Sequence, residues 1–353
     1  MDYQQENNVW VIGHKNPDTD SICAAICYAN LKNRLQDGFH YIPKRAGSIN
    51  EETKYVLQHF GVEPPEYAED AGAQVKDIAF RRTAGVSGHI SLKKAWELMK
   101  TENVMTLAVT SASDKLEGLI ITGDIAESYM DVYDNHILSR ARTQYKNIVE
   151  TLNGTLLAGN EHAYFLRGKV VVATGSRDVI EECIESDDLV IVGDRDETHI
   201  CALEENASCM VVTGGTQVSA QVLEMANRRD CVVIITPYDT FTAARLINQS
   251  MPIKYFMKKE NFVTFDIDDY VDEVREVMSK KRHRDFPVLD DQRRYLGMVS
   301  RRNLLNMHKK KLILVDHNEK SQAIDGIEGA EILEIIDHHR LGSLETMSPV
   351  FFR

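Results

Sequence analysis

Short apolar runs followed by polar loops and longer apolar-rich segments open the chain. Residues 9–14, "VWVIGH", form the first such run, and their length and β-branched content predict a buried parallel strand. A polar loop follows, and the apolar-rich segment 21–35 is long enough for a helix, with Thr19 or Asp20 as its cap. The chain thus begins with a strand, a loop rich in acidic residues and a helix.

The same order recurs directly afterwards. Residues 41–47 predict a second short strand, and residues 50–61 predict a helix with Asn50 as the N-cap. Thr53 occupies the third helical position, where a capping box would need Glu or Gln, so no full capping box forms. This β-α-β-α order predicts the start of a doubly wound α/β domain. Two prolines and a glycine within residues 62–72 end the pattern, and we expect a domain boundary there.

Two later segments repeat one pattern. Residues 89–130 and residues 269–307 each read as an apolar-faced helix, a strand, an Asp-containing turn, a second strand and a closing helix. Between them lie four apolar strand candidates separated by helices such as 217–229, which predicts a further unit with a parallel sheet. The four strand candidates are residues 169–175, 188–195, 209–215 and 231–237.

The opening pattern returns near the C-terminal end. Residues 309–320 predict a strand that ends at Asp316 and His317, and residues 330–342 predict another that ends in a triplet of Asp and two His. The simplest organisation is one α/β domain that is interrupted by a large insert and resumes near residue 310. In open α/β sheets, ligand-binding groups gather at the carboxyl ends of the strands.

Composition narrows the function classes. The chain has 353 residues, which favours two or three domains, and its 43% hydrophobic content is that of a globular protein. A net charge of −13 disfavours a broad nucleic-acid surface, and no apolar run is long enough to span a bilayer. The polar start of the chain lacks the features of a secretion signal, and the six cysteines lack paired metal-binding spacing. We expect small buried cysteines in a reducing cytoplasm.

Acidic and histidine residues follow three of the predicted strands. They are His14, Asp18 and Asp20; Asp316; and Asp337, His338 and His339. Taken singly, each cluster is weakly specific, because water or a helix N-terminus can also accommodate such residues and paired histidines are common on surfaces. Together at strand ends they predict a centre for one or two divalent cations, of the kind that clamps and hydrolyses phosphoryl groups. Ligation by nitrogen and oxygen without thiolate suits Mn, Co, Mg or Zn.

These motifs carry a resemblance to a known family. "GHKNPDTDS", "LVDHNE" and "IIDHHRLG" together resemble the DHH phosphoesterase superfamily, and specifically the family II inorganic pyrophosphatases. The resemblance implies hydrolysis of pyrophosphate to two phosphates, with Mn²⁺ or Co²⁺ in a two-metal site and Mg²⁺ accompanying the substrate. By motif position it implies these metal ligands: His14, Asp18, Asp20, Asp316 and His338.

The resemblance also assigns roles around the ligands. Asp316 would bridge the two metals and lower the pKa of a bridging water, and His339 would contact the substrate. Asp337 would support these groups from behind rather than bind metal. For His317 two interpretations stay open, a functional residue and a solvent-facing histidine at a strand end.

The insert resembles regulatory domains. The repeated units resemble CBS domains, which pair into adenine-nucleotide sensors, and "VGDRDE" and "VVTGG" between them resemble a DRTGG domain. This arrangement characterises a subset of family II pyrophosphatases. It implies the following division: 1–70, first part of the DHH domain; 71–130, first CBS unit; 131–250, DRTGG-like domain; 251–308, second CBS unit; 309–353, continuation of the DHH domain.

The second CBS unit carries the better nucleotide motif. Gly297 to Asn303 fits the pattern that holds phosphate and ribose in CBS domains, and its arginines could pair with phosphates. The first unit keeps Asp124 but has Ile in place of the usual hydroxyl residue. The expected nucleotide-binding residues are Ser300, Arg301, Asn303 and Asp124. The expected regulators are AMP, ADP, ATP and diadenosine polyphosphates, with a homodimer formed through the CBS units.

The end of the sequence departs from the family pattern. The family's DHH domain continues further and is followed by a basic domain that grips pyrophosphate, so we expect this chain to be C-terminally truncated and low in activity alone. The alternative function is an adenine-nucleotide-sensing module with a non-catalytic DHH remnant. A DHH phosphoesterase acting on nucleotides is disfavoured by the insert. Membrane and nucleic-acid partners are not expected.

Overall fold

The computed structural model describes residues 7–130, 134–175, 177–306 and 309–339. The chain divides into two compact units, and neither is one continuous stretch of sequence. The first comprises residues 1–82, 264–291 and 297–353, and the second comprises residues 83–263 and 292–296. Arg340 and Gly342, which follow the DHH triplet, lie outside the described residues.

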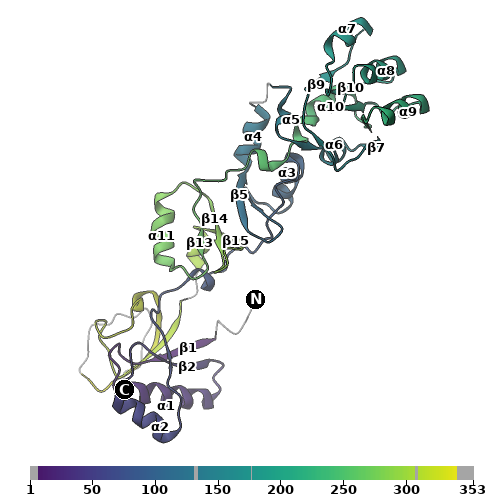
Figure 1. Ribbon diagram of the computed structural model, residues 1–353. Coiled ribbons are helices and arrows are strands. Elements are labelled where there is room, and N and C mark those ends of the chain that lie inside the picture. Colours follow the sequence, from purple (N-terminus) through teal and green to yellow (C-terminus); the bar gives the residue numbers. More distant parts are fainter. Residues whose placement is uncertain (1–6, 131–133, 176, 307–308, 340–353) are drawn as a thin grey trace. The chain divides into compact units, whose positions relative to one another are not determined.

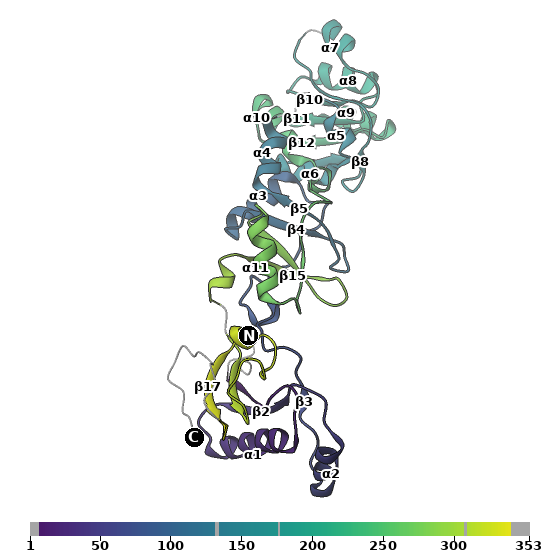
Figure 2. The same ribbon diagram turned by 90° about the vertical axis from the view of Figure 1, so that its left-hand side faces the viewer.

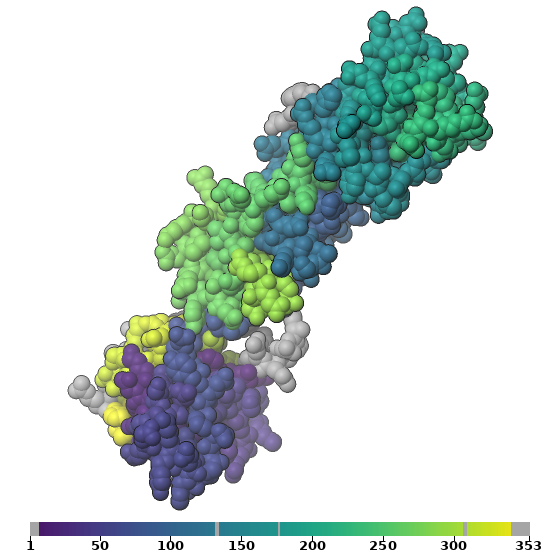
Figure 3. Space-filling model, in the orientation of Figure 1, coloured from purple at the N-terminus to yellow at the C-terminus, as the bar shows by residue number. Residues whose placement is uncertain are grey.

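A five-stranded parallel sheet dominates the first unit (Figures 1 and 2). Its order is β17-β16-β1-β2-β3. The strands are β1 (Asn8–Ile12), β2 (His40–Arg45), β3 (Glu66–Tyr67), β16 (Lys311–Val315) and β17 (Glu331–Ile336). Strand β1 pairs with β16, with Val11 opposite Ile313, so segments far apart in the sequence are neighbours. Figure 3 shows these early (purple) and late (yellow) segments in one body. The prediction that one α/β domain is interrupted and resumes near residue 310 agrees with this pairing.

Side chains that alternate along β1 and β16 build apolar layers on both faces of this sheet. Val9 and Val11 pack with Ala25 and Ala29 of helix α1 (Thr19–Leu35), whereas Ile12 packs in a separate cluster on the other face. Helix α2 (Glu51–Phe60) begins after Asn50, whose side chain accepts from the Thr53 amide, as the sequence predicts. The predicted cap of α1 is wrong by one residue or more: Asp18 is the N-cap, and its carboxylate accepts from the Ser21 amide at 2.9 Å.

The rest of the first unit contains most of the second repeat, of which residues 292–296 belong to the second unit. Its elements are the short 3-10 helix η1 (Val75–Asp77), strand β13 (Phe265–Asp266), helix α11 (Val271–Lys280), strands β14 (Asp285–Leu289) and β15 (Tyr295–Ser300), and the 3-10 helices η4 (Asn303–Asn306) and η5 (Ile327–Gly329). Strands β13, β14 and β15 form one three-stranded sheet. The closing helix expected for this repeat is only the short turn η4 in the described residues.

The second unit contains the first repeat and a parallel sheet. The repeat is helix α3 (Leu92–Thr101), strands β4 (Thr106–Thr110) and β5 (Leu116–Ile121), and helix α4 (Thr122–Met130), in the predicted order. The four predicted strands are β9 (Val170–Val172), β10 (Leu189–Val192), β11 (Cys209–Val212) and β12 (Val232–Ile235), and they are parallel to one another. Strand β7 (Thr155–Ala158), which the sequence analysis missed, pairs antiparallel with β12.

Short helices complete the second unit. They are α5 (Ile137–Arg140), α6 (Tyr145–Thr151), α7 (Arg177–Cys183), α8 (Asp196–Glu204), α9 (Ala220–Arg228), α10 (Thr240–Leu246), η2 (Ile247–Ser250) and η3 (Ile253–Tyr255), together with the two-residue strands β6 (Thr143–Gln144) and β8 (Tyr164–Phe165). The predicted helix 217–229 starts later, because Ser219 caps it by accepting from the Val222 amide. The fold is therefore α/β with parallel sheets in both units.

Candidate metal centre

The candidate site lies where the strand order of the first sheet reverses. From β1 the chain adds β2 and β3 on one side, and it later returns to add β16 and β17 on the other. The loop after β1 and the residue after β16 therefore meet at the carboxyl edge, beside the point of reversal. Such a switch point is where open α/β sheets bind ligands.

Asp316 is the residue at the centre of the site. It follows β16 directly, is buried and has a φ of 59°, a left-handed conformation that Asp adopts more readily than most residues. Its amide donates to the Ile336 carbonyl at 2.9 Å, and this bond holds Asp316 beside the end of β17. Burial raises the pKa of its carboxyl, and the charges of Asp20 and Asp18 add to that effect.

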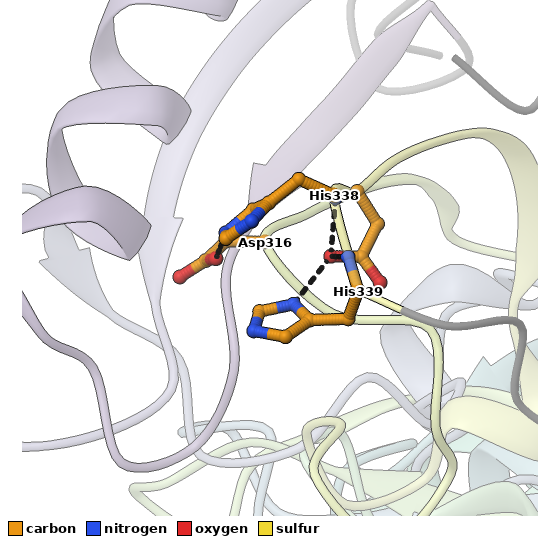
Figure 4. A group of neighbouring side chains, drawn as sticks. Asp316, His338 and His339 are labelled. Carbon is orange, nitrogen blue, oxygen red and sulfur yellow. Dashed lines mark hydrogen bonds and ion pairs between the residues drawn. The ribbon is translucent and has the colours of Figure 1, made fainter.

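Histidines from two different segments reach Asp316. His14 Nε2 lies 3.3 Å from one carboxylate oxygen. His338 Nε2 lies 3.3 Å from the other, as Figure 4 shows. His14 Nε2 also lies 3.9 Å from Asp18, and His338 Nε2 lies 3.6 Å from Asp20. The structure thus brings together every residue that the sequence predicted as a metal ligand.

Two groups of donor atoms share Asp316. His14, Asp18 and Asp316 form one, and Asp316 with the Asp337–His338–His339 triplet forms the other; within each group the donor atoms lie within 4.8 Å of one another. Imidazole nitrogens and carboxylate oxygens at these separations suit Mn²⁺, Co²⁺, Mg²⁺ or Zn²⁺. The side chains of Asp18, Asp20 and His338 are more than half exposed, so the centre is open on one side.

Asp337 orients the histidine pair. Its Oδ1 accepts from the His338 amide at 2.8 Å, and from the His339 amide and ring Nδ1 at 3.2 and 2.7 Å. Burial acts to raise the Asp337 pKa, but the hydrogen bonds from His339 and Asn318 outweigh it, and the pKa is lowered. The hydrogen bond to Asp337 in turn raises the pKa of His339. The ring of His339 is more than half exposed and is available to a ligand.

Two buried residues lie directly after Asp316. One of them contradicts a prediction, and the other was not predicted. His317 is fully buried, so the solvent-facing interpretation is wrong. Its Nδ1 lies 2.9 Å from the Val315 carbonyl, and burial lowers its pKa despite that bond. Asn318, which the sequence analysis did not single out, is buried and donates its amide to Asp337. The sequence signal for Asn318 is only its place directly after Asp316 and His317.

The expected nucleotide-binding residues are found in both units. In the first unit, the Asn303 side chain accepts from the Ser300 amide and hydroxyl at 2.9 and 2.6 Å and donates to the Ala79 carbonyl at 2.7 Å. The Arg301 guanidinium donates to backbone carbonyls at and just beyond the end of α11. In the second unit, Asp124 is buried, accepts from the Ile121 amide at 2.9 Å and lies 3.3 Å from Lys258 Nζ.

No helix in the described part of the chain has the length and apolar character that a membrane crossing needs.

Comparisons with known proteins show two domain families in the chain and relatives that match it over nearly its full length. The DRTGG domain family matches residues 147–250, and the CBS domain family matches residues 253–309. The chain is 41% identical over 345 residues to the "Cobalt-dependent inorganic pyrophosphatase" of Clostridium perfringens, which covers 98% of this chain and 63% of the relative. It is 38% identical over 344 residues to the "Probable manganese-dependent inorganic pyrophosphatase" of Thermotoga maritima, covering 98% of this chain and 62% of the relative. The chain therefore spans about three fifths of the length of these relatives.

A solved structure matches the insert. It contains the CBS and DRTGG domains of the regulatory region of Clostridium perfringens pyrophosphatase, complexed with the activator diadenosine tetraphosphate. The match has a TM-score of 0.62 and 36% sequence identity, and it covers 65% of this chain and 100% of that structure. The chain thus contains DRTGG and CBS domains and is homologous, over nearly its full length, to the manganese- and cobalt-dependent inorganic pyrophosphatases.

Proposed function

We propose that this chain forms the metal-binding part of a cobalt- or manganese-dependent inorganic pyrophosphatase that hydrolyses pyrophosphate to two phosphates. The observation that carries the proposal is the convergence of two donor groups on Asp316 at the switch point of the sheet. The proposed metal ligands are His14, Asp18, Asp20, Asp316 and His338.

The donor set fits a pair of divalent cations. Several carboxylates in one place repel one another unless cations lie among them. Burial raises the pKa of Asp316, and the charges of Asp20 and Asp18 add to that effect. Because Asp316 belongs to both groups, it is the residue suited to bridge two ions. When bound, the cations would lower the pKa of a coordinated water and neutralise charge on phosphoryl oxygens, and Mg²⁺ would accompany the substrate.

His339 is proposed to bind the substrate. Asp337 fixes the ring by accepting from Nδ1, which leaves the other ring nitrogen, Nε2, to donate to a phosphoryl oxygen when the ring is protonated. The raised pKa of His339 favours that protonated state, because Asp337 stabilises the charge. Asp337 itself is a positioning residue, held by Asn318 from the end of the neighbouring strand.

Adenine nucleotides are proposed as regulators. The arguments are the similarity to an activator-bound regulatory region and the Gly297–Asn303 motif at the end of β15. Ser300, Arg301, Asn303 and Asp124 are the proposed contacts for AMP, ADP, ATP or diadenosine polyphosphates, in a homodimer formed through the CBS units. The proposal includes a cytoplasmic location, as the cysteine composition predicts.

The second candidate function is a nucleotide-sensing module whose DHH part does not catalyse. The observation that favours it is that the chain covers 100% of the solved regulatory region with the activator bound.

Calorimetry separates the two functions. We expect the wild-type chain to bind about two equivalents of Co²⁺ and the Asp316→Asn variant to bind fewer. In a separate assay, we expect the wild type to release more phosphate from pyrophosphate in the presence of Co²⁺ than the variant does. Both chains should bind diadenosine tetraphosphate equally, since Asp316 lies outside the CBS and DRTGG segments. Nucleotide binding without any Co²⁺ binding would overturn the first proposal and support the second.

A further inference from the structure

The loop after β1 and the first turn of α1, which carry three of the proposed metal ligands, contact the segment between β2 and α2 and the first turn of α2. We propose that Gly47 of that segment and Thr53 of α2 are positioning residues for His14, Asp18 and Asp20. The inference rests on the proposed function, because it concerns the same centre.

Position 47 requires glycine because a side chain there would clash with neighbouring atoms, and not because of its backbone angles. It is not among the glycines with positive φ, so any residue could adopt its backbone angles. A Cβ atom at this position would lie 2.1 Å from the Lys15 carbonyl oxygen and 2.6 Å from Pro17 Cδ. Both distances are far below van der Waals contact, and the Lys15 oxygen is backbone, so the loop would have to move. Lys15 and Pro17 lie between His14 and Asp18 in the sequence, and their displacement shifts those two ligands.

Thr53 fixes the other end of the loop. It is fully buried, and its amide donates to the Asn50 side chain at 2.8 Å, which holds Thr53 in the first turn of α2. Its hydroxyl lies 3.0 Å from the hydroxyl of Thr19. Thr19 is the first residue of α1 and stands between Asp18 and Asp20. The hydroxyl pair therefore fixes the helix start from which two carboxylates project.

Other contacts also hold the loop, and Asp18 Oδ1 accepts from the Ser21 amide at 2.9 Å. The Ser21 hydroxyl accepts from the His14 amide at 3.1 Å, and the Lys15 amide donates to the Gln322 carbonyl at 2.8 Å. Lys15, Asn16 and Asp18 are exposed and contribute no core packing. Since a metal centre needs its donor atoms within about 0.5 Å of their productive positions, the contacts of Gly47 and Thr53 bear directly on affinity. Loss of such outer support typically lowers metal affinity by about 10–100-fold.

Two pairs of variants test the inference. Gly47→Ala is matched by Gly193→Ala, because a Cβ at Gly193 meets nothing within 4 Å. Thr53→Val removes the hydroxyl and keeps the shape of the side chain. Thr53→Ser keeps the hydroxyl and removes the methyl group. Each chain is titrated with Co²⁺ by calorimetry, the absorption spectrum of bound Co²⁺ is recorded, and thermal unfolding is measured in EDTA.

We expect Gly47→Ala and Thr53→Val to weaken Co²⁺ binding by about 10–100-fold and to alter the Co²⁺ spectrum, and Gly193→Ala and Thr53→Ser to resemble wild type. If Gly47→Ala does not fold, the Thr53 pair decides alone. Wild-type affinity and spectrum in Thr53→Val would overturn the inference and leave the proposed function intact. Absence of Co²⁺ binding by the wild-type chain would instead overturn the proposed function.

Discussion

Replacing Asp316 with asparagine should move stability in opposite directions with and without metal. Asparagine keeps the shape and tolerates the φ of 59° at this position, so the substitution removes the charge without adding backbone strain. Without metal, it relieves repulsion among carboxylates. With Co²⁺, it removes the proposed ligand that the two donor groups share.

The size of the effect follows from the distances. At the 4.8 Å limit that joins the Asp18 and Asp316 donor atoms, two unit charges repel by about 3.5 kcal/mol in an effective dielectric constant of 20. Asp18 is 60% exposed, so solvent screening reduces this to about 1 kcal/mol. A ligand at 100 times its Kd adds about 2.7 kcal/mol to the folded state.

Calorimetric unfolding in EDTA and in excess Co²⁺ measures both effects. We expect the metal-free melting temperature of Asp316→Asn to rise by about 2–4 °C. We expect Co²⁺ to raise the melting temperature of the wild type by about 5–10 °C and that of the variant not at all. Asp114→Asn is the control, because Asp114 also has a positive φ but lies in the turn between β4 and β5. A destabilised metal-free variant that still gains the wild-type increase with Co²⁺ would refute the reasoning.

Three further predictions concern other parts of the chain. Asp337→Asn should weaken Co²⁺ binding by about 10-fold, because it disturbs the acceptor of three hydrogen bonds from the histidine pair; unchanged affinity in a Co²⁺ titration would contradict this. Burial, together with the hydrogen bond to Asp37, raises the pKa of Tyr41 to about 12. The folded state therefore holds this proton more tightly than the unfolded state. The wild type should be more stable than Tyr41→Phe by the full amount below about pH 10, and this difference should disappear as the pH rises to about 12. A pH-independent difference in the free energy of urea unfolding would show that Tyr41 does not titrate this way. Ile191→Ala in β10 should cost the second unit about 2–5 kcal/mol, since Ile191 is fully buried, and a loss below 1 kcal/mol in urea unfolding would mean that the site collapses around the cavity.

Local patterns in the sequence were enough to predict the parallel strands and the return of the chain near residue 310. The hydrophobic runs before His14 and Asp316 have the length of buried strands, and the polar residues at their ends indicated a common domain. The direct pairing of these two strands is a finding of the structure. The cap of α1 was misplaced because Asp18, Thr19 and Asp20 are all good caps, and only the three-dimensional path of the loop selects Asp18.

Contacts between distant segments were not predictable in the same way. The burial of His317 depends on packing around the end of β16, and a strand-end position alone does not reveal it. A side chain at position 47 would clash with Lys15 and Pro17, which lie about 30 residues earlier in the sequence. Hydrophobic periodicity does not predict such a contact. Asn318 likewise acquires its role only because β17 brings Asp337 beside it.

The pairing of β1 with β16 also sets the time at which the centre can form during synthesis. At about 5–20 residues per second, the roughly 300 residues between the two strands take about 15–60 s to emerge. During that interval β1 has an unpaired edge, a known site of improper association. The insert can fold in the meantime. The segment with His14, Asp18 and Asp20 can meet Asp316 and His338 only after those residues have been synthesised. The proposed metal centre therefore forms late in translation, and a chain that stalls within the insert exposes the edge of β1 while it lacks Asp316 and His338.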